Sequence, residues 1–156
     1  MCFWKNLAKF VGMKQSIDFL PERKQRDLHE LVGLIRDEVK DVVMIILYGS
    51  YARNTYVELD IRRDYGGGKI QYMSDYDILV VSKKRLGSRT VTVSSRVKSS
   101  FLKNKNADTQ TRPQIINESI TKFNNALSEG RYFYVDILTE GIVLYDSGEC
   151  QLATPC

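Results

Sequence analysis

The chain has 156 residues, of which 43% are hydrophobic and 27% charged, and its formal net charge is +4. This length suits one core and is too short for two comfortable domains. Three cysteines (Cys2, Cys150 and Cys156) are an odd number without metal-type spacing, which predicts a reduced, cytoplasmic chain rather than a disulfide framework. A single histidine removes the usual His-based catalysis and most transition-metal sites. No apolar run approaches the roughly 20 residues that span a bilayer.

The ends of the chain differ from its middle. Residues 1–20 are predicted to be an N-terminal extension, partly disordered, and its apolar part is too short and interrupted for a signal peptide. The functional start is either Met1 or Met13. Residues 21–146 are predicted to form the domain, and residues 147–156 a tail or the beginning of a linker to a missing domain.

Helical and extended patterns alternate along the middle of the chain. The stretch 22–40 has apolar residues at helical spacing, and 42–47 (VVMIIL) is a continuous apolar run of the buried-strand kind. Further elements are expected in this order: a β-hairpin over 60–72, a strand over 77–81, a helix within 94–103, a short strand at 115–116, a helix ending at Gly130, a helix over 132–140 and a last strand over 142–145.

Two acidic residues enter the strand at 77–81 one residue apart. Residues i and i+2 of a strand project to the same face, so Asp75 and Asp77 are expected to lie side by side. Two carboxylates that close repel each other, which raises one pKa unless a cation lies between them. Mg²⁺ takes hard oxygen ligands and is usually held by one or two carboxylates together with substrate phosphates.

A Gly-Ser pair interrupts the chain directly after the apolar run at 42–47. The backbone N–H groups of Gly49 and Ser50, the Ser50 hydroxyl and the nearby Arg53 suit a triphosphate. A Gly-Ser after a strand is usually only a turn, and a lone Asp-x-Asp is usually a solvated strand edge. Together, in this order and each tied to its own apolar strand, the two motifs indicate nucleotidyl transfer.

The segments GSYARN (49–54) and SDYDILVV (74–81) resemble the two signatures of the DNA polymerase beta-type nucleotidyltransferase superfamily, in its minimal nucleotidyltransferase (MNT) branch. The resemblance runs from Leu20 to Asp146. Over this span the chain is similar to the N-terminal half of bacterial proteins that fuse an MNT domain to a HEPN domain. It implies an α/β (α+β) fold with a palm-like core: a small mixed sheet, helices mainly on one face, and the hairpin over 60–72 as an insertion.

The chain departs from the superfamily pattern at three places. Asn54 replaces a second glycine, a small change because asparagine tolerates unusual backbone angles. The hairpin lengthens the connection between the motifs. Active members usually carry a third aspartate on a later strand, and its counterpart here is Gln114, which cannot supply an anionic ligand or act as a base. Glu118 and Asp136 are the candidate third acids, although Asp136 is expected on a helix.

Three functions are compatible with these observations. The first is a Mg²⁺-dependent nucleotidyltransferase that binds one or two Mg²⁺ through Asp75 and Asp77 and transfers AMP from ATP to a hydroxyl; the resemblance implies a HEPN toxin as acceptor and an antitoxin role. The second is a catalytically impaired nucleotide- or protein-binding module that neutralises a HEPN partner. The third and weaker one is an antibiotic or other small-molecule nucleotidyltransferase.

The stretch 83–105 contains eight basic residues and no acidic one. It is compatible with nucleic acid, but a solvated helix face is favoured because its one aromatic residue, Phe101, fits the apolar stripe. No residue of the sequence fixes the nucleotide base or the oligomeric state.

Overall fold

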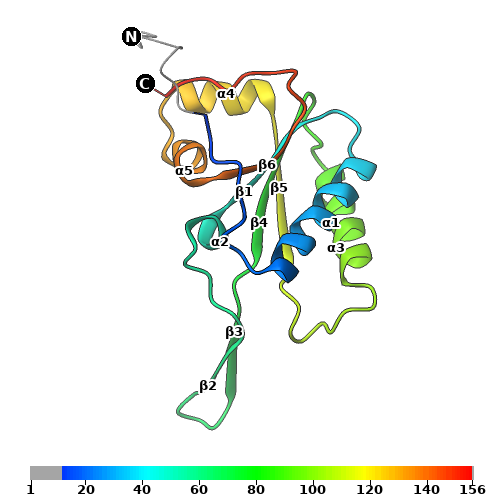
Figure 1. Cartoon of the computed structure of the whole chain (residues 1–156), viewed down its shortest axis with the longest axis vertical. Helices are drawn as coiled ribbons and strands as arrows, with labels where there is room; N and C mark the ends of the chain where they lie inside the picture. The colour runs from blue at the N-terminus through cyan, green and yellow to red at the C-terminus, as the bar shows by residue number, and fades with distance from the viewer. Residues whose placement is uncertain (1–11, 156) are drawn as a thin grey trace.

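The computed structural model describes residues 12–155, and a four-stranded sheet lies at its centre (Figure 1). The strand order is β5-β4-β1-β6, formed by Pro113–Ser119, Tyr76–Ser82, Val42–Tyr48 and Ile142–Asp146. β1 is antiparallel to both of its neighbours, and β4 is parallel to β5. The two central strands, β1 and β4, are apolar almost throughout because both of their faces are covered. The predicted mixed sheet is confirmed.

Helices cover both faces of this sheet. α1 (Glu22–Glu38) and α3 (Arg89–Leu102) lie on one face, whereas the shorter α4 (Ile120–Ser128) and α5 (Tyr132–Glu140) cover the other. The prediction of helices mainly on one face therefore holds only for the two long ones. The reason is that alternate side chains of β1 and β4 are apolar on both faces, so each face needs its own cover.

Each face has its own apolar cluster. The first cluster joins the sheet to α1 and α3 and includes Leu28, Leu31, Ile35, Val93, Val97 and Phe101. The second joins the sheet to α4 and α5 and includes Ile46, Leu79, Val81, Phe123, Leu127 and Ile137. In both long helices the buried residues recur at intervals of three or four, which is the spacing that keeps them on one face.

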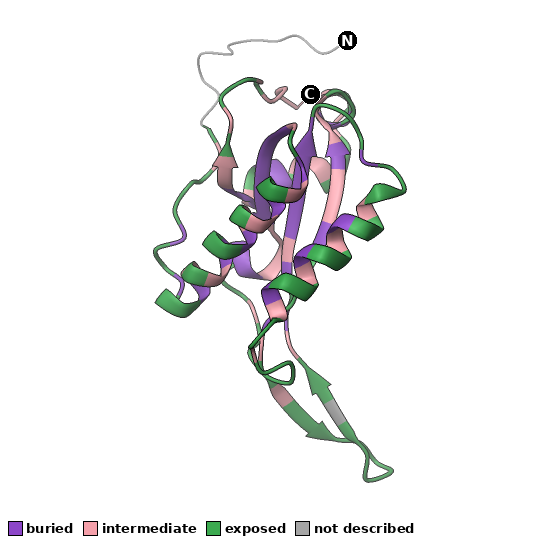
Figure 2. Ribbon diagram, turned by 90° about the vertical axis from the view of Figure 1, so that its right-hand side faces the viewer, coloured by how far each residue is buried: buried purple, intermediate pink, exposed green. Residues whose placement is uncertain are grey.

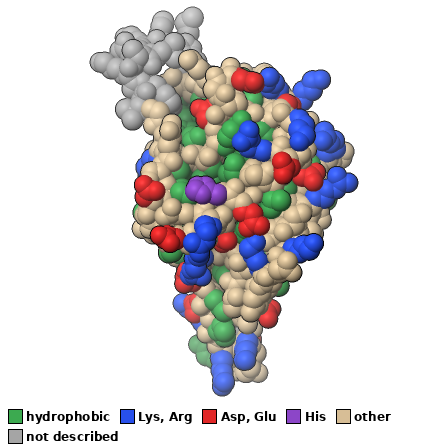
Figure 3. Space-filling model, turned by 45° about the vertical axis from the view of Figure 1, so that its right-hand side comes forward, with side chains coloured by type: hydrophobic (Ala, Val, Ile, Leu, Met, Phe, Trp, Pro, Cys, Tyr) green, Lys and Arg blue, Asp and Glu red, His purple; other side chains and the backbone are tan. Residues whose placement is uncertain are grey.

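The basic stretch forms the solvent side of α3 and its flanking loops. Phe101 is fully buried against the sheet, as predicted. Both basic and acidic side chains lie on the face of the molecule that Figure 3 shows. Ion pairs join Arg96 to Glu38 at 3.6 Å and Lys105 to Glu30 at 2.8 Å. These pairs support the interpretation of a solvated helix face.

The hairpin between the two motifs is present and projects from the body (Figures 1 and 2). Its strands are β2 (Asp60–Arg63) and β3 (Lys69–Tyr72), and they pair with each other as a separate two-stranded sheet. At its tip the Asp64 carboxylate accepts hydrogen bonds from the backbone N–H groups of Gly66 and Gly68 at 3.0 and 2.7 Å. The glycines therefore form a turn, in agreement with the sequence.

Both ends of the described chain pack against the body. Ile17 and Leu20 belong to the first apolar cluster, so the later part of the predicted extension is core, while residues 1–11 lie outside the described residues. Residues 151–153 run along α4, where Asn124 accepts a hydrogen bond from the Ala153 N–H at 2.7 Å. This segment is part of the fold rather than a free tail. In residues 12–155 no helix is both long and apolar enough to span a bilayer.

Candidate functional site

The two motifs meet where β1 ends beside the beginning of β4. The antiparallel register places Tyr48 opposite Asp77, and the chain turns into α2 (Gly49–Arg53) directly after Tyr48. Gly49 has a φ of +73°, which favours glycine. A Cβ on Gly49 would also collide with the Asp77 carboxylate, whose Cγ would be 3.2 Å away. The phosphate-binding candidate and the metal-binding candidate are therefore in direct contact.

Asp75 and Asp77 have different surroundings. Asp77 lies within β4, half-buried, on the sheet face that α4 and α5 cover, whereas Asp75 precedes the strand and is exposed. Burial raises the pKa of Asp77, the charge of Asp75 raises it further, and Arg53 opposes the rise. Two hard oxygen donors that repel each other form a donor set that a divalent cation relieves. The residues present thus fit Mg²⁺.

The Gly-Ser loop is held by its own short turn. Ser50 accepts a backbone hydrogen bond from Thr55 at 2.9 Å, and Asn54 ends α2 in the left-handed conformation with φ 59°. Asparagine thus takes the conformation that the sequence analysis allowed for it. Arg53 forms an ion pair with Glu140 of α5 at 3.3 Å, and both side chains are about half exposed. The arrangement leaves Arg53 at the surface beside the acidic pair.

The strand register places Gln114 directly beside Asp77 on the neighbouring strand β5. Glu118 lies four residues further along β5, roughly 13 Å away at 3.3 Å per residue. There it is buried, accepts a hydrogen bond from Tyr134 at 3.2 Å and pairs with Lys122 at 3.6 Å. Asp136 is exposed on α5, the helix expected for it.

Neither candidate third acid joins Asp75 and Asp77 in a metal-type group. Within residues 12–155, no three His, Cys, Asp or Glu side chains gather in such a group. The structure therefore leaves two carboxylates and the Gln114 carboxamide at this end of the sheet.

The sequence analysis did not single out Tyr48, which lies opposite Asp77, or Phe133, which packs against Tyr48. Burial and the charge of Asp77 raise the pKa of Tyr48 to about 12, so its hydroxyl stays neutral near pH 7. The half-exposed ring of Phe133 meets the Tyr48 ring edge to face, with centroids 5.9 Å apart. The sequence signal that could have identified Tyr48 as a site residue is its position as the last residue of β1, directly before Gly49.

A buried lysine behind the site was also missed. Lys24 is 4% exposed and lies on the same stripe of α1 as Leu28, Leu31 and Ile35. A lysine on an apolar stripe is the signal that could have revealed it, because buried lysines are rare unless they are paired.

No protein-family model matches the sequence, and no curated protein matches it significantly. Among solved structures the chain is similar to a chain of the complex between the tri-AMPylated HEPN toxin of Shewanella oneidensis and an MNT antitoxin (TM-score 0.46, 15% identity, covering 81% of this chain and 75% of that one). It is also similar to a candidate nucleotidyltransferase from Sulfolobus solfataricus (TM-score 0.42, 16% identity, covering 87% of this chain and 93% of that one). A third similar structure is that of a toxin–antitoxin with AMP-PNP (TM-score 0.43, 15% identity, covering 77% of this chain and 73% of that one). Because these identities and TM-scores are low, any function proposed for this chain is argued from the geometry of its own site.

Replacing Gly49 by alanine tests the contact between the two motifs, and Gly148→Ala is a matched control. Gly148 has a similar φ of +76° but open space around its Cβ position. We expect both variants to lose about 1–2 kcal/mol in urea unfolding from backbone strain. We expect only Gly49→Ala to displace the Asp77 carboxylate and therefore to weaken Mg²⁺ binding, by about tenfold. Equal Mg²⁺ affinities in the two variants, measured by calorimetry, would contradict the contact.

The raised pKa of Asp77 predicts that this carboxylate destabilises the metal-free fold. Since protonation is favoured in the folded state, metal-free stability falls as pH rises through the pKa of Asp77. We expect Asp77→Asn to raise the melting temperature in EDTA at pH 7 by about 1–3 °C. Asp108→Asn, in an exposed loop, should leave it unchanged. A lower melting temperature for Asp77→Asn would show that the carboxylate stabilises the fold instead.

Proposed function

We propose that this chain is a Mg²⁺-dependent nucleotidyltransferase that transfers AMP from ATP to a hydroxyl of a partner protein. The observation that carries the proposal is the close approach of the Gly49 backbone to the Asp77 carboxylate. It joins a loop suited to phosphates with a pair of acids suited to a divalent cation, and nucleotidyl transfer needs both at one place.

The position of each residue indicates whether it would bind metal or phosphate. Asp75 and Asp77 would hold one or two Mg²⁺, which when bound neutralise phosphate charge and align the triphosphate. The backbone of Gly49 and Ser50 would bind phosphate oxygens together with the Ser50 hydroxyl. Arg53, at the exposed edge of the site, would contribute a positive charge to the same phosphates.

The open setting of the acidic pair favours a macromolecular acceptor. Asp75 is exposed, and the hairpin leaves the body directly beside it. The base of the hairpin is fixed there, because Ser74 and Val57 exchange hydrogen bonds of 2.8 and 2.9 Å. We propose a HEPN-type toxin as acceptor and an antitoxin role in the cytoplasm, as the resemblance of the two sequence motifs implies.

A second candidate function follows from Gln114. A neutral carboxamide beside Asp77 leaves the metal-binding end of the sheet with two carboxylates instead of three. Under this alternative the chain binds nucleotide or a HEPN-type partner without catalysing transfer, and it neutralises the partner by occupying its surface.

Labelling with [α-³²P]ATP tests the transfer. We expect the purified chain and Mg²⁺ to label a protein in an extract of the cells that naturally produce it, whereas [γ-³²P]ATP leaves that protein unlabelled. Asp77→Asn removes a metal ligand and should lower the labelling rate by at least about 100-fold. Asp108→Asn is the control and should label normally. Undiminished labelling by Asp77→Asn would refute the assignment of the site.

Two variants of equal shape at position 114 distinguish the enzyme from the binding module. Gln114→Asp adds a carboxylate beside Asp77, and Gln114→Asn adds only a neutral group of the same size. We expect Gln114→Asp to bind Mn²⁺ about tenfold more tightly than Gln114→Asn. Equal affinities would mean that position 114 does not face the metal. Transfer by Gln114→Asp but not by the parent chain would establish the binding module.

A further inference from the structure

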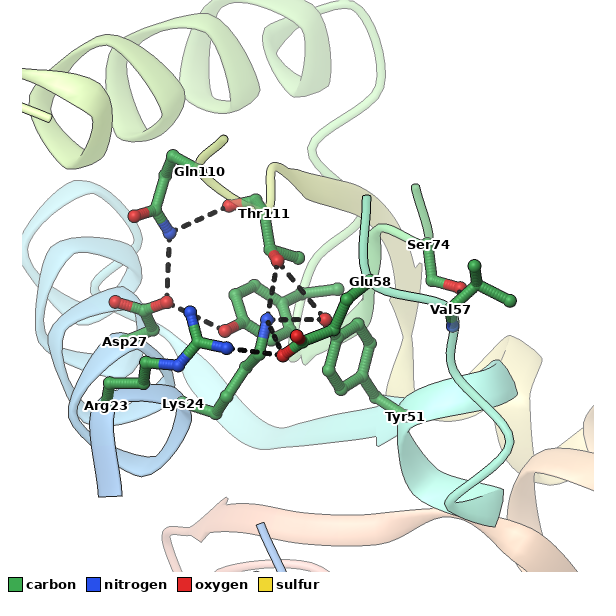
Figure 4. A network of polar contacts seen from close by, with 10 residues as sticks. Arg23, Lys24, Asp27, Tyr51, Val57, Glu58, Ser74, Gln110 and Thr111 are labelled. Carbon is green, nitrogen blue, oxygen red and sulfur yellow. Dashed lines mark hydrogen bonds and ion pairs between the residues drawn. The ribbon is translucent and has the colours of Figure 1, made fainter. Parts of the chain in front are cut away.

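The Lys24 side chain enters the body behind the candidate site and ends in a hydrogen-bonded cluster (Figure 4). Its ammonium donates hydrogen bonds to Tyr51 Oη at 2.8 Å and to Thr111 Oγ1 at 2.9 Å. These two oxygens lie 3.1 Å apart and are hydrogen-bonded to each other. Three side chains distant in sequence thus form one closed triangle.

Aromatic rings surround the same ammonium. Lys24 Nζ lies 5.1, 5.7 and 5.8 Å from the ring centroids of Tyr51, Tyr56 and Tyr76. The rings of Tyr51 and Tyr56 are stacked, with centroids 4.2 Å apart and an interplanar angle of 8°. Distances below about 6 Å allow cation–π attraction with each ring.

Burial makes this arrangement costly. It lowers the pKa of Lys24, and the charge of Arg23 lowers it further. One carboxylate, that of Glu58, lies 3.8 Å from the ammonium, and it also pairs with Arg23. A buried charge is weak support for stability, so an apolar side chain could serve packing alone. Lysine supplies hydrogen-bond donors at this position that an apolar side chain would lack.

The groups that Lys24 holds belong to the segments that carry the site. Tyr51 follows Ser50, Tyr76 lies between Asp75 and Asp77, and Thr111 is three residues before Gln114. Tyr76 faces the α1 side of the sheet, so the ammonium lies behind the acidic pair rather than among the reacting groups. Lys24 therefore contacts the segments that carry Ser50, Asp77 and Gln114, from the sheet face that α1 covers.

A second contact from α1 fixes two of the same segments. Asp27 accepts a hydrogen bond from Tyr76 Oη at 2.7 Å. It accepts another from Gln110 Nε2 at 2.9 Å (Figure 4). Asp27 lies three residues after Lys24, on the same side of the helix. The first turns of α1 thus act as one rigid support for the strand ends around the site.

We propose that Lys24 is a positioning residue: through Tyr51, Tyr76 and Thr111 its ammonium holds the Gly49–Ser50 loop in register with Asp75 and Asp77. This inference rests on the proposed function, because it assigns Lys24 to the metal and nucleotide site described for that function. Without the ammonium, Tyr51 Oη and Thr111 Oγ1 keep their hydrogen bond to each other, but the loop loses its hydrogen-bonded link to α1.

The test compares Lys24→Met with Ile35→Ala. Methionine keeps an unbranched side chain and removes the charge and both hydrogen bonds, while Ile35 is a fully buried residue near the other end of α1. We expect Lys24→Met to weaken Mn²⁺ binding, measured by electron paramagnetic resonance, about tenfold. Ile35→Ala should destabilise the fold but keep the parent affinity. Equal affinities in the two variants would overturn the inference.

Amide hydrogen exchange provides a readout that does not need metal. The Thr55 N–H bonds to the Ser50 carbonyl at 2.9 Å and reports on the loop. It should exchange about tenfold faster in Lys24→Met than in Ile35→Ala. If the parent binds no Mn²⁺, the proposed function fails and Thr55 exchange alone decides the inference. If Lys24→Met does not fold, Thr111→Val replaces it in both measurements, and parent-like values in that variant would overturn the inference.

Discussion

The pairing of β1 with β4 is the constraint on which the rest of the site depends. It sets Tyr48 opposite Asp77, so the turn after β1 begins against the acidic pair. Gly49 is needed there because its φ is positive and because a Cβ would collide with the Asp77 carboxylate. A shift of the register by one residue would turn Asp77 away from its face and separate the two motifs.

The front and the back of this end of the sheet have opposite electrostatic characters. In front, Asp75 and Asp77 repel each other, and burial adds to the cost of ionising Asp77. Behind, the Lys24 ammonium is enclosed by aromatic rings and two hydroxyls. Both arrangements lower the stability of the fold. A cation bound between Asp75 and Asp77 would remove the cost of their repulsion. Costs of this kind persist where the surrounding packing fixes the geometry, which the apolar clusters on both faces supply here.

Features that depend on local pattern could be predicted from the sequence. The β1 strand and the hairpin follow from spacing, and the resemblance gave the mixed sheet and placed Gln114 on a later strand. The strand alternation expected to align Asp75 with Asp77 does not extend to Asp75, which precedes β4. Features that depend on distant partners could not. The apolar stripe of α1 could have indicated that Lys24 is buried, but only the folded chain brings it to Tyr51 and Thr111, which are 27 and 87 residues away. The packing of residues 151–153 on α4 and the two-sided helical cover depend on tertiary contacts in the same way.

The most direct test of a joined phosphate and metal site is a calorimetric titration of ATP into the parent chain, with and without Mg²⁺. The same titration is made with the double variant Asp75→Asn/Asp77→Asn. The geometry predicts ATP binding that requires Mg²⁺ in the parent and is lost in the double variant. Absence of Mg²⁺-dependent binding in the parent, or its survival in the double variant, would contradict the account of this end of the sheet as a nucleotide site.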